Sequence, residues 1–200
     1  MTRPSPSPFE IAASFVLKKG EDPSNAPYTR HLLETVAWLE RLTPSPEEAL
    51  RTAAVLHDVE RLLKNPDPAR FRKGWESFKD PRYLRWHQQR SAQIAASLLR
   101  RGKVEESFVE RVYKLVRHHE EGGTDEQNLL KDADSLSFLD VSAGRFIEDW
   151  VPVTGKVKVR EKIEWMFDRM TLPEAKRFGR PLFARAVDKL EGFRVSLPDF

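Results

Sequence analysis

Apolar residues recur every three or four positions along most of the chain. Between Tyr28 and Leu42 they fall at positions 32, 33, 36, 39 and 42, which predicts an amphipathic helix. The same spacing predicts further helices over 8–17, 46–63, 81–101, 104–120, 125–139, 157–170 and 173–191. Two-residue alternation is limited to a short stretch at 151–159, and no repeat of 20–50 residues is evident. The pattern therefore predicts an all-α fold.

Turn residues and capping signals separate these predicted helices. Segment 65–68, with two prolines, ends one helix firmly, and segment 69–80 is expected to be a short helix or an ordered loop. A Ser or Thr followed three residues later by Glu or Gln predicts a capping box, in which each residue bonds the backbone of the other. Such pairs are Ser7 with Glu10, Ser45 with Glu48, Thr124 with Gln127, and Thr171 with Glu174.

The composition is that of one soluble globular domain. Of the 200 residues, 40% are hydrophobic and 32% charged, and the net charge of +3 comes from interspersed signs rather than a basic block. A nucleic-acid partner is therefore not favoured. Cysteine is absent, which excludes disulfides and thiolate chemistry. No apolar run approaches the ~20 residues of a membrane span, and the polar start of the chain lacks a signal segment, so a cytoplasmic protein without membrane contact is expected.

Histidines and acidic residues lie near the ends of successive predicted helices. The five histidines are His31, His57, His87, His118 and His119. Asp58 directly follows one of them, and Asp132 and Asp134 interrupt an otherwise apolar helix. Imidazole and carboxylate ligands without sulfur suit Zn, Fe, Mn, Co or Ni. Because a helical bundle can project such side chains inward, the sequence predicts a metal site.

Three segments carry a resemblance to a known family. His31, the pair His57-Asp58, and the segment 133–136 (Ala-Asp-Ser-Leu) stand in the order and at intervals similar to the HD-domain superfamily of metal-dependent phosphohydrolases. The resemblance covers about 28–140. It departs from the family at Ser135, where many members have arginine, and at 59–61, which argues against the cyclic-dinucleotide branch. Neither departure removes a metal ligand.

The resemblance implies an HD-domain-like helical bundle with additional C-terminal helices. The tail and a short helix would occupy 1–27, the metal-binding domain 28–150, and helices packing on that domain 151–200. The layout is also similar to a family of uncharacterised domains that share the segment 83–86 (Tyr-Leu-Arg-Trp).

The resemblance also implies roles for individual residues. A metal would be held by His31, His57, Asp58 and Asp134, with His57 and Asp58 also catalytic. The implied ligands of a second metal are His87, His118 and His119. Basic residues about one helical turn from a ligand would hold the substrate phosphate: Arg61, Lys64, Arg90 and Arg117. The cofactor would be one or two divalent ions, Mn, Co, Ni, Zn, Fe or Mg.

The implied activity is hydrolysis of a nucleotide or other small phosphoester by metal-activated water. Two alternatives stay open: a di-iron oxygenase on the same fold, and a regulatory domain that binds metal or nucleotide without turnover. A homodimer is compatible with the sequence. Other roles are also open for some of these residues. His118 and His119 could be cations that interact favourably with the dipole at the C-terminal end of a helix. Asp132 is expected to support a ligand or to face solvent, and the cations of 156–162 are expected to form a solvated face or to contact phosphate.

Overall fold

The computed structural model describes residues 5–63 and 79–194, and within these ranges it is all-α, as predicted, without a β-strand. The main helices are α1 (Pro8–Gly20), α2 (Ala26–Leu42), α3 (Glu48–Leu56), α4 (Pro81–Arg101), α5 (Glu106–Arg117), α6 (Asp125–Ser137), α7 (Ala143–Asp168) and α8 (Pro173–Gly192). Short 3₁₀ turns, η1 (Pro23–Asn25) and η2 (Val59–Leu62), and a π-helical turn, η4 (Phe138–Ser142), join them. Most of the predicted segment 69–80, with Lys64, lies outside the described residues.

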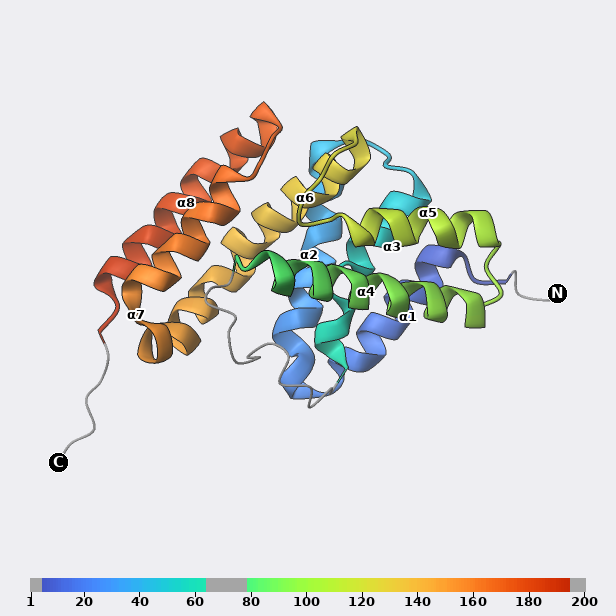
Figure 1. Cartoon of the computed structure of the whole chain (residues 1–200), viewed down its shortest axis with the longest axis horizontal. Coiled ribbons are helices and arrows are strands. Elements are labelled where there is room, and N and C mark those ends of the chain that lie inside the picture. Colours follow the sequence, from blue (N-terminus) through green and yellow to red (C-terminus); the bar gives the residue numbers. More distant parts are fainter. Residues whose placement is uncertain (1–4, 64–78, 195–200) are drawn as a thin grey trace.

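Helix α2 occupies the middle of the molecule (Figure 1). It packs against α3 and α6, while α4 and α5 form a second pair that covers α3. Helices α7 and α8 pack together as a hairpin beside α6 and η4. The predicted C-terminal helices are thus present, and α7 crosses residue 150, where the sequence suggested a division.

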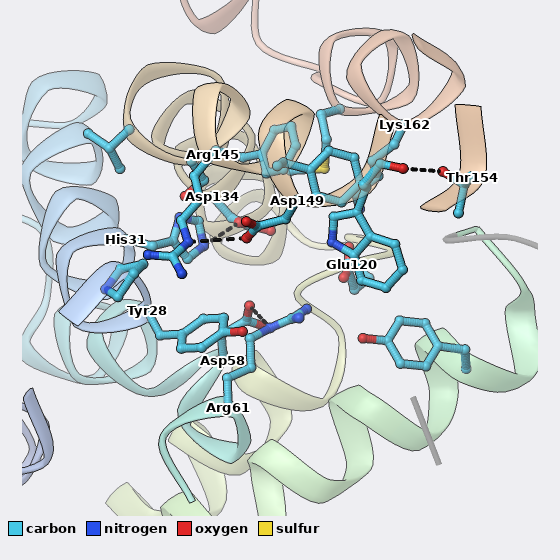
Figure 2. Close-up of a pocket in the computed structure, with 18 of the residues that line it drawn as sticks. Tyr28, His31, Asp58, Arg61, Glu120, Asp134, Arg145, Asp149, Thr154 and Lys162 are labelled. Atoms are coloured by element: carbon cyan, nitrogen blue, oxygen red, sulfur yellow. Dashed lines mark hydrogen bonds and ion pairs between the residues drawn. The ribbon is translucent and has the colours of Figure 1, made fainter. Parts of the chain in front are cut away.

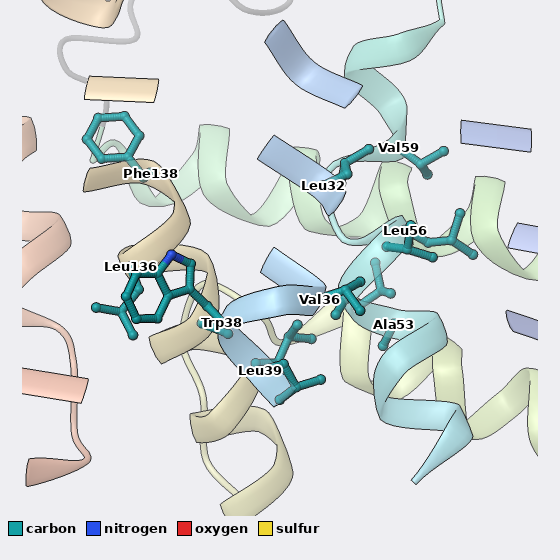
Figure 3. Close-up of a cluster of buried hydrophobic side chains, with 14 of the residues drawn as sticks. Leu32, Val36, Trp38, Leu39, Ala53, Leu56, Val59, Leu136 and Phe138 are labelled. Atoms are coloured by element: carbon teal, nitrogen blue, oxygen red, sulfur yellow. The ribbon is translucent and has the colours of Figure 1, made fainter. Parts of the chain in front are cut away.

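The core forms where the apolar faces of α2, α3 and α6 meet (Figure 3). Leu32 and Leu39 of α2, Leu56 of α3 and Leu136 of α6 are fully buried. Burial of one such side chain stabilises the fold by about 1.5–3 kcal/mol. This packing fixes the relative positions of the helix ends that carry the histidines.

Two of the four predicted capping boxes form. Both reciprocal bonds are present at Ser7 with Glu10 and at Thr124 with Gln127. The prediction at Ser45 is wrong: this residue takes a left-handed φ of 55°, and α3 begins three residues later with Glu47 as N-cap.

The box predicted at Thr171 with Glu174 is also wrong. Leu172 is the N-cap of α8, and the backbone N–H of Thr171 donates to Asp132 instead. A tertiary contact has replaced the local one.

Two helix boundaries differ from the periodic pattern. Helix α3 ends at Leu56 rather than near Leu63, so His57 and Asp58 lie in the turn before η2. The stretch 151–159 belongs to α7 and not to an alternating strand, although Gly155 breaks the helix with a φ of 82°. In the part of the chain that the structure describes, no helix has the length and apolar character needed to cross a bilayer.

Candidate metal centre

Four histidines from four different parts of the chain meet at one buried point. His31 comes from α2, His57 from the end of α3, His87 from α4, and His119 from the turn after α5. His31 is 7% exposed and the other three are fully buried. The Nε2 atoms of His31 and His57 lie 3.2 Å apart, and the His57 and His119 ring centroids are 5.0 Å apart.

Each of these imidazoles is held through its other ring nitrogen. Nδ1 of His57 lies 2.8 Å from the carbonyl of Ala54, and Nδ1 of His119 lies 2.7 Å from the carbonyl of Val116. In both cases the partner is a carbonyl oxygen, which can only accept a hydrogen bond, so the imidazole proton must be on Nδ1. Nε2 then presents a lone pair to the centre, as in metal-ligating histidines.

His31 and His87 are oriented by side chains. Nδ1 of His87 lies 3.0 Å from Oε1 of Glu60. Nδ1 of His31 lies 2.9 Å from the hydroxyl oxygen of Ser137, whose own proton is donated to the His31 carbonyl. These contacts again leave both Nε2 atoms directed at the centre.

Three carboxylates face the histidines with one oxygen and an arginine with the other. Oδ1 of Asp134 lies 3.1 Å from Nε2 of His31, while Oδ2 pairs with Arg169. Oδ1 of Asp58 lies 2.6 Å from Nε2 of His87, while Oδ2 pairs with Arg61.

Glu120 completes this arrangement. Its Oε1 lies 3.8 Å from Nε2 of His119, and its Oε2 pairs with Arg169. Its backbone N–H donates to the buried amide of Gln88, 3.0 Å away, which fixes the position of the residue. Each inner oxygen is therefore available to a cation, and each outer oxygen is already satisfied.

Three groups of side chains among the described residues could each hold an ion, with ligand atoms in each group within 4.8 Å of one another. Two of them share no residue: His31, His57 and Asp134 form one, and Asp58, His87 and His119 form the other. The third, His119, Glu120 and Asp134, overlaps both. Nε2 of His119 is buried without a hydrogen-bond partner among the described residues, whereas Nε2 of His87 lies 2.6 Å from Oδ1 of Asp58. A buried polar atom is costly when unpaired, so the unpaired Nε2 of His119 fits a bound metal.

The electrostatics of the centre also favour a cation. Burial alone would raise the pKa of Asp58, but Arg61, His87 and His57 outweigh it and hold this pKa well below its usual range. Burial opposes the charged form of His87, yet Asp58 raises its pKa well above the usual value, so a metal that bound this imidazole would have to displace a proton. Burial dominates at His119 and lowers its pKa, which keeps this imidazole neutral as a ligand must be.

A cavity of about 540 Å³ opens onto this centre. His31, Asp58, Glu120 and Asp134 line its inner end (Figure 2). Its volume is in the range of small-molecule sites. A ligand in the cavity would therefore have direct access to the candidate metal ligands.

Several predicted site residues lie elsewhere. The side chain of His118 is 44% exposed, with Nδ1 3.6 Å from Glu121, so of the adjacent pair only His119 enters the centre. Arg61 lines the cavity, but Arg90 and Arg117 do not, and Arg117 donates to Gln89. The predicted phosphate contacts of these two arginines are not supported by their positions.

The structure brings in residues that the sequence patterns did not indicate. Glu120 and Arg169 join the ligand cluster, and Glu60 orients His87. Glu120 directly follows the histidine pair, which was a usable signal. No sequence signal of this kind marks Arg169, because this residue reaches the centre from the C-terminal end of α7.

Two cations of 156–162, Lys158 and Lys162, line the cavity. The ammonium of Lys162 lies 4.2 Å from the ring centroid of Trp165. Burial lowers the pKa of Lys162 to about 8, although Glu120 acts in the opposite direction. The expectation of a solvated face therefore does not hold for this residue.

Together these features define an all-α protein with a buried histidine–carboxylate centre at the end of a cavity. The model of a family described as a domain of unknown function, DUF4202, matches residues 14–178, and the chain belongs to this family. No curated protein and no solved structure was found to match the chain.

Proposed function

We propose that the chain is a metal-dependent phosphohydrolase of the HD superfamily that acts on a nucleotide or another small phosphoester. The observation that supports this most is the convergence of four imidazole Nε2 atoms and three inner carboxylate oxygens beside a cavity. The order His31, His57-Asp58, Asp134 is the order that the resemblance requires.

The two ligand groups would hold one or two divalent ions. His31, His57 and Asp134 form one site with Asp58 adjacent, and Asp58, His87 and His119 form the other. A bound divalent metal lowers the pKa of coordinated water from 15.7 toward about 7 and polarises a phosphoryl oxygen.

The chain's own cations would position the substrate. Arg61 and Lys162 line the cavity beside the carboxylates, where they can bind phosphate oxygens. Arg169 holds the outer oxygens of Asp134 and Glu120, and Glu60 holds His87, so the ligand geometry is set before substrate arrives.

Arg169 also bears on the departure from the family pattern at Ser135. Its Nε donates to the Ser135 hydroxyl at 2.8 Å, and its guanidinium pairs with the neighbouring Asp134. We infer that Arg169 supplies from α7 the guanidinium that many HD proteins carry at the position of Ser135.

The test joins metal analysis to activity. Protein purified without chelator is expected to contain about one or two divalent ions per chain and to release phosphate from nucleotides when Mn²⁺, Co²⁺, Ni²⁺ or Mg²⁺ is supplied. Asp58→Ala is expected to lose both properties, because it removes an inner ligand oxygen. Asp188→Ala, at an exposed aspartate of α8, is the matched control and should keep both.

Lys162→Met separates metal binding from substrate binding. This variant should retain the metal, since the lysine is outside both ligand groups, but should raise KM for the phosphoester. If Asp58→Ala keeps its metal and its activity, the assignment of the centre is wrong.

The presence of two adjacent ligand groups also favours a second candidate, a di-iron oxygenase. That reading predicts two irons per chain and an oxygen-dependent reaction, with no phosphate release. Iron quantification and oxygen uptake with the same preparation separate the two functions.

A further inference from the structure

The part of the cavity beyond the ligand cluster is lined by four aromatic side chains, three of them from the C-terminal half of the chain. Phe146 and Trp150 come from α7, Phe138 from η4, and Tyr28 from α2. The ring centroids of Phe138 and Phe146 are 5.5 Å apart, and those of Phe146 and Trp150 are 6.1 Å apart. These three rings form a continuous row along one wall.

Polar groups accompany this row. Arg145 and Asp149 line the same cavity, with the Arg145 Nε 3.1 Å from the Asp149 Oδ2. In Figure 2 their side chains approach from the side opposite Tyr28 and Arg61. Both are about half exposed, so the Asp149 carboxylate can exchange Arg145 for a ligand donor at small cost.

The side chains along this wall of the cavity indicate which kind of ligand it can bind. Aromatic faces stack with planar rings, and such stacking tolerates many rings because each offers a π-face. A carboxylate accepts hydrogen bonds from ring or exocyclic N–H groups. Arg61 and Lys162 line the same cavity, and their positive charges would attract an anionic group of the ligand.

We propose that Trp150 and Phe146 of α7 form a subsite for a planar heteroaromatic ring of the substrate, with Asp149 accepting hydrogen bonds from the ring's N–H groups. The inference rests on the proposed function only in placing the substrate's phosphate at the inner end. It assigns ring specificity to α7, a helix without a sequence motif.

The test compares two ligands that differ only in the ring. Adenosine 5′-monophosphate and ribose 5-phosphate are titrated separately into chelator-treated full-length protein and followed by calorimetry, so that no hydrolysis intervenes. The adenosine compound is expected to bind at least about tenfold more tightly, as stacking of one base implies. Equal affinities, or binding of neither compound, would overturn the subsite.

Substitutions locate the ring. Trp150→Ala should reduce the affinity ratio to nearly one, and Asp149→Asn should reduce it partly. Val153→Ala is the matched control, because Val153 is on the same helix and is 71% exposed, and it should leave the ratio unchanged. If Trp150→Ala does not fold by circular dichroism, Phe146→Leu replaces it with the same expected direction. If the folded variant keeps the affinity ratio of the unchanged protein, the result would contradict the proposal.

Failure of this inference and failure of the proposed function give different results. Ring preference without metal-dependent hydrolysis would retain the subsite and reject the phosphohydrolase. Metal-dependent hydrolysis without ring preference would do the reverse.

Discussion

Asp132 and Asp134 lie two residues apart on α6 and are both buried, but they belong to two different regions of the molecule. Asp132 is at the junction with α8, where its carboxylate accepts hydrogen bonds from the backbone N–H groups of Thr171 (2.9 Å) and Leu172 (2.7 Å). Burial raises the pKa of Asp132, because these N–H donors offset it only in part. The carboxylate ties the start of α8 to α6.

Asp134 faces the metal centre instead. Burial would raise its pKa also, but Arg169 and His57 outweigh burial and hold it well below its usual range. Its inner oxygen lies 3.1 Å from Nε2 of His31 and 3.4 Å from Nε2 of His57, whereas the oxygens of Asp132 accept hydrogen bonds from backbone N–H groups. Burial of a carboxylate therefore does not identify a ligand; the groups opposite it do.

The largest effect is expected from exchanging these two aspartates for alanine. Asp134→Ala should abolish metal binding and reduce hydrolysis to background, because it removes a ligand oxygen. Asp132→Ala should keep the metal but lower the free energy of unfolding by about 1–3 kcal/mol, the cost of buried N–H groups left without an acceptor. Metal quantification and urea unfolding measure the two effects.

These variants test the comparison directly. Loss of metal in a folded Asp132→Ala protein would remove the distinction between the regions, as would full metal content in Asp134→Ala.

Arg169→Met should have the next largest effect. It leaves the carboxylates of Asp134 and Glu120 buried without their cation, which typically costs 3–5 kcal/mol. Mn²⁺ should recover more thermal stability in this variant than in the unchanged protein, because the ion supplies the missing charge. Thermal unfolding with chelator and with Mn²⁺ measures this.

Arg177→Met is the matched control, since this arginine is exposed and paired with Glu174 at the surface. It should unfold as the unchanged protein does. An Arg169→Met protein that gains nothing extra from Mn²⁺ would mean that Arg169 acts through packing alone.

The smallest effect is expected at His118. His118→Ala should change the unfolding free energy by no more than about 0.5 kcal/mol and leave metal affinity unchanged, because the side chain is exposed. His119→Ala should lower metal affinity by at least about tenfold. Equilibrium dialysis with Mn²⁺ compares them, and equal affinities in the two variants would contradict the assignment of His119.

Part of the candidate site could be predicted because its residues stand in recognisable local pairs. The pair His57-Asp58, the histidine on the preceding helix and the Ala-Asp segment of α6 were all indicated by sequence order, and the structure brings them together. The arginine that pairs with the outer oxygen of Asp134 could not be predicted in this way. Arg169 follows Asp134 by 35 residues, and no spacing rule connects them.

Helix boundaries show the same division. The capping boxes at Ser7 and Thr124 form because both partners lie within one turn. The box expected at Thr171 fails because Asp132 from α6 takes the Thr171 N–H. Local rules hold where no distant group competes for the same hydrogen bond.

The sequence by itself determined the all-α class and most helix positions, because apolar periodicity and breakers act over a few residues. It also identified the histidines and aspartates of the centre by type and order. Only the tertiary structure decided that His119 rather than His118 is inside, that Arg169 and Glu120 join the ligands, and that α7 walls the cavity. These outcomes depend on how helices far apart in the chain pack, and packing determines which side of each helix end becomes buried.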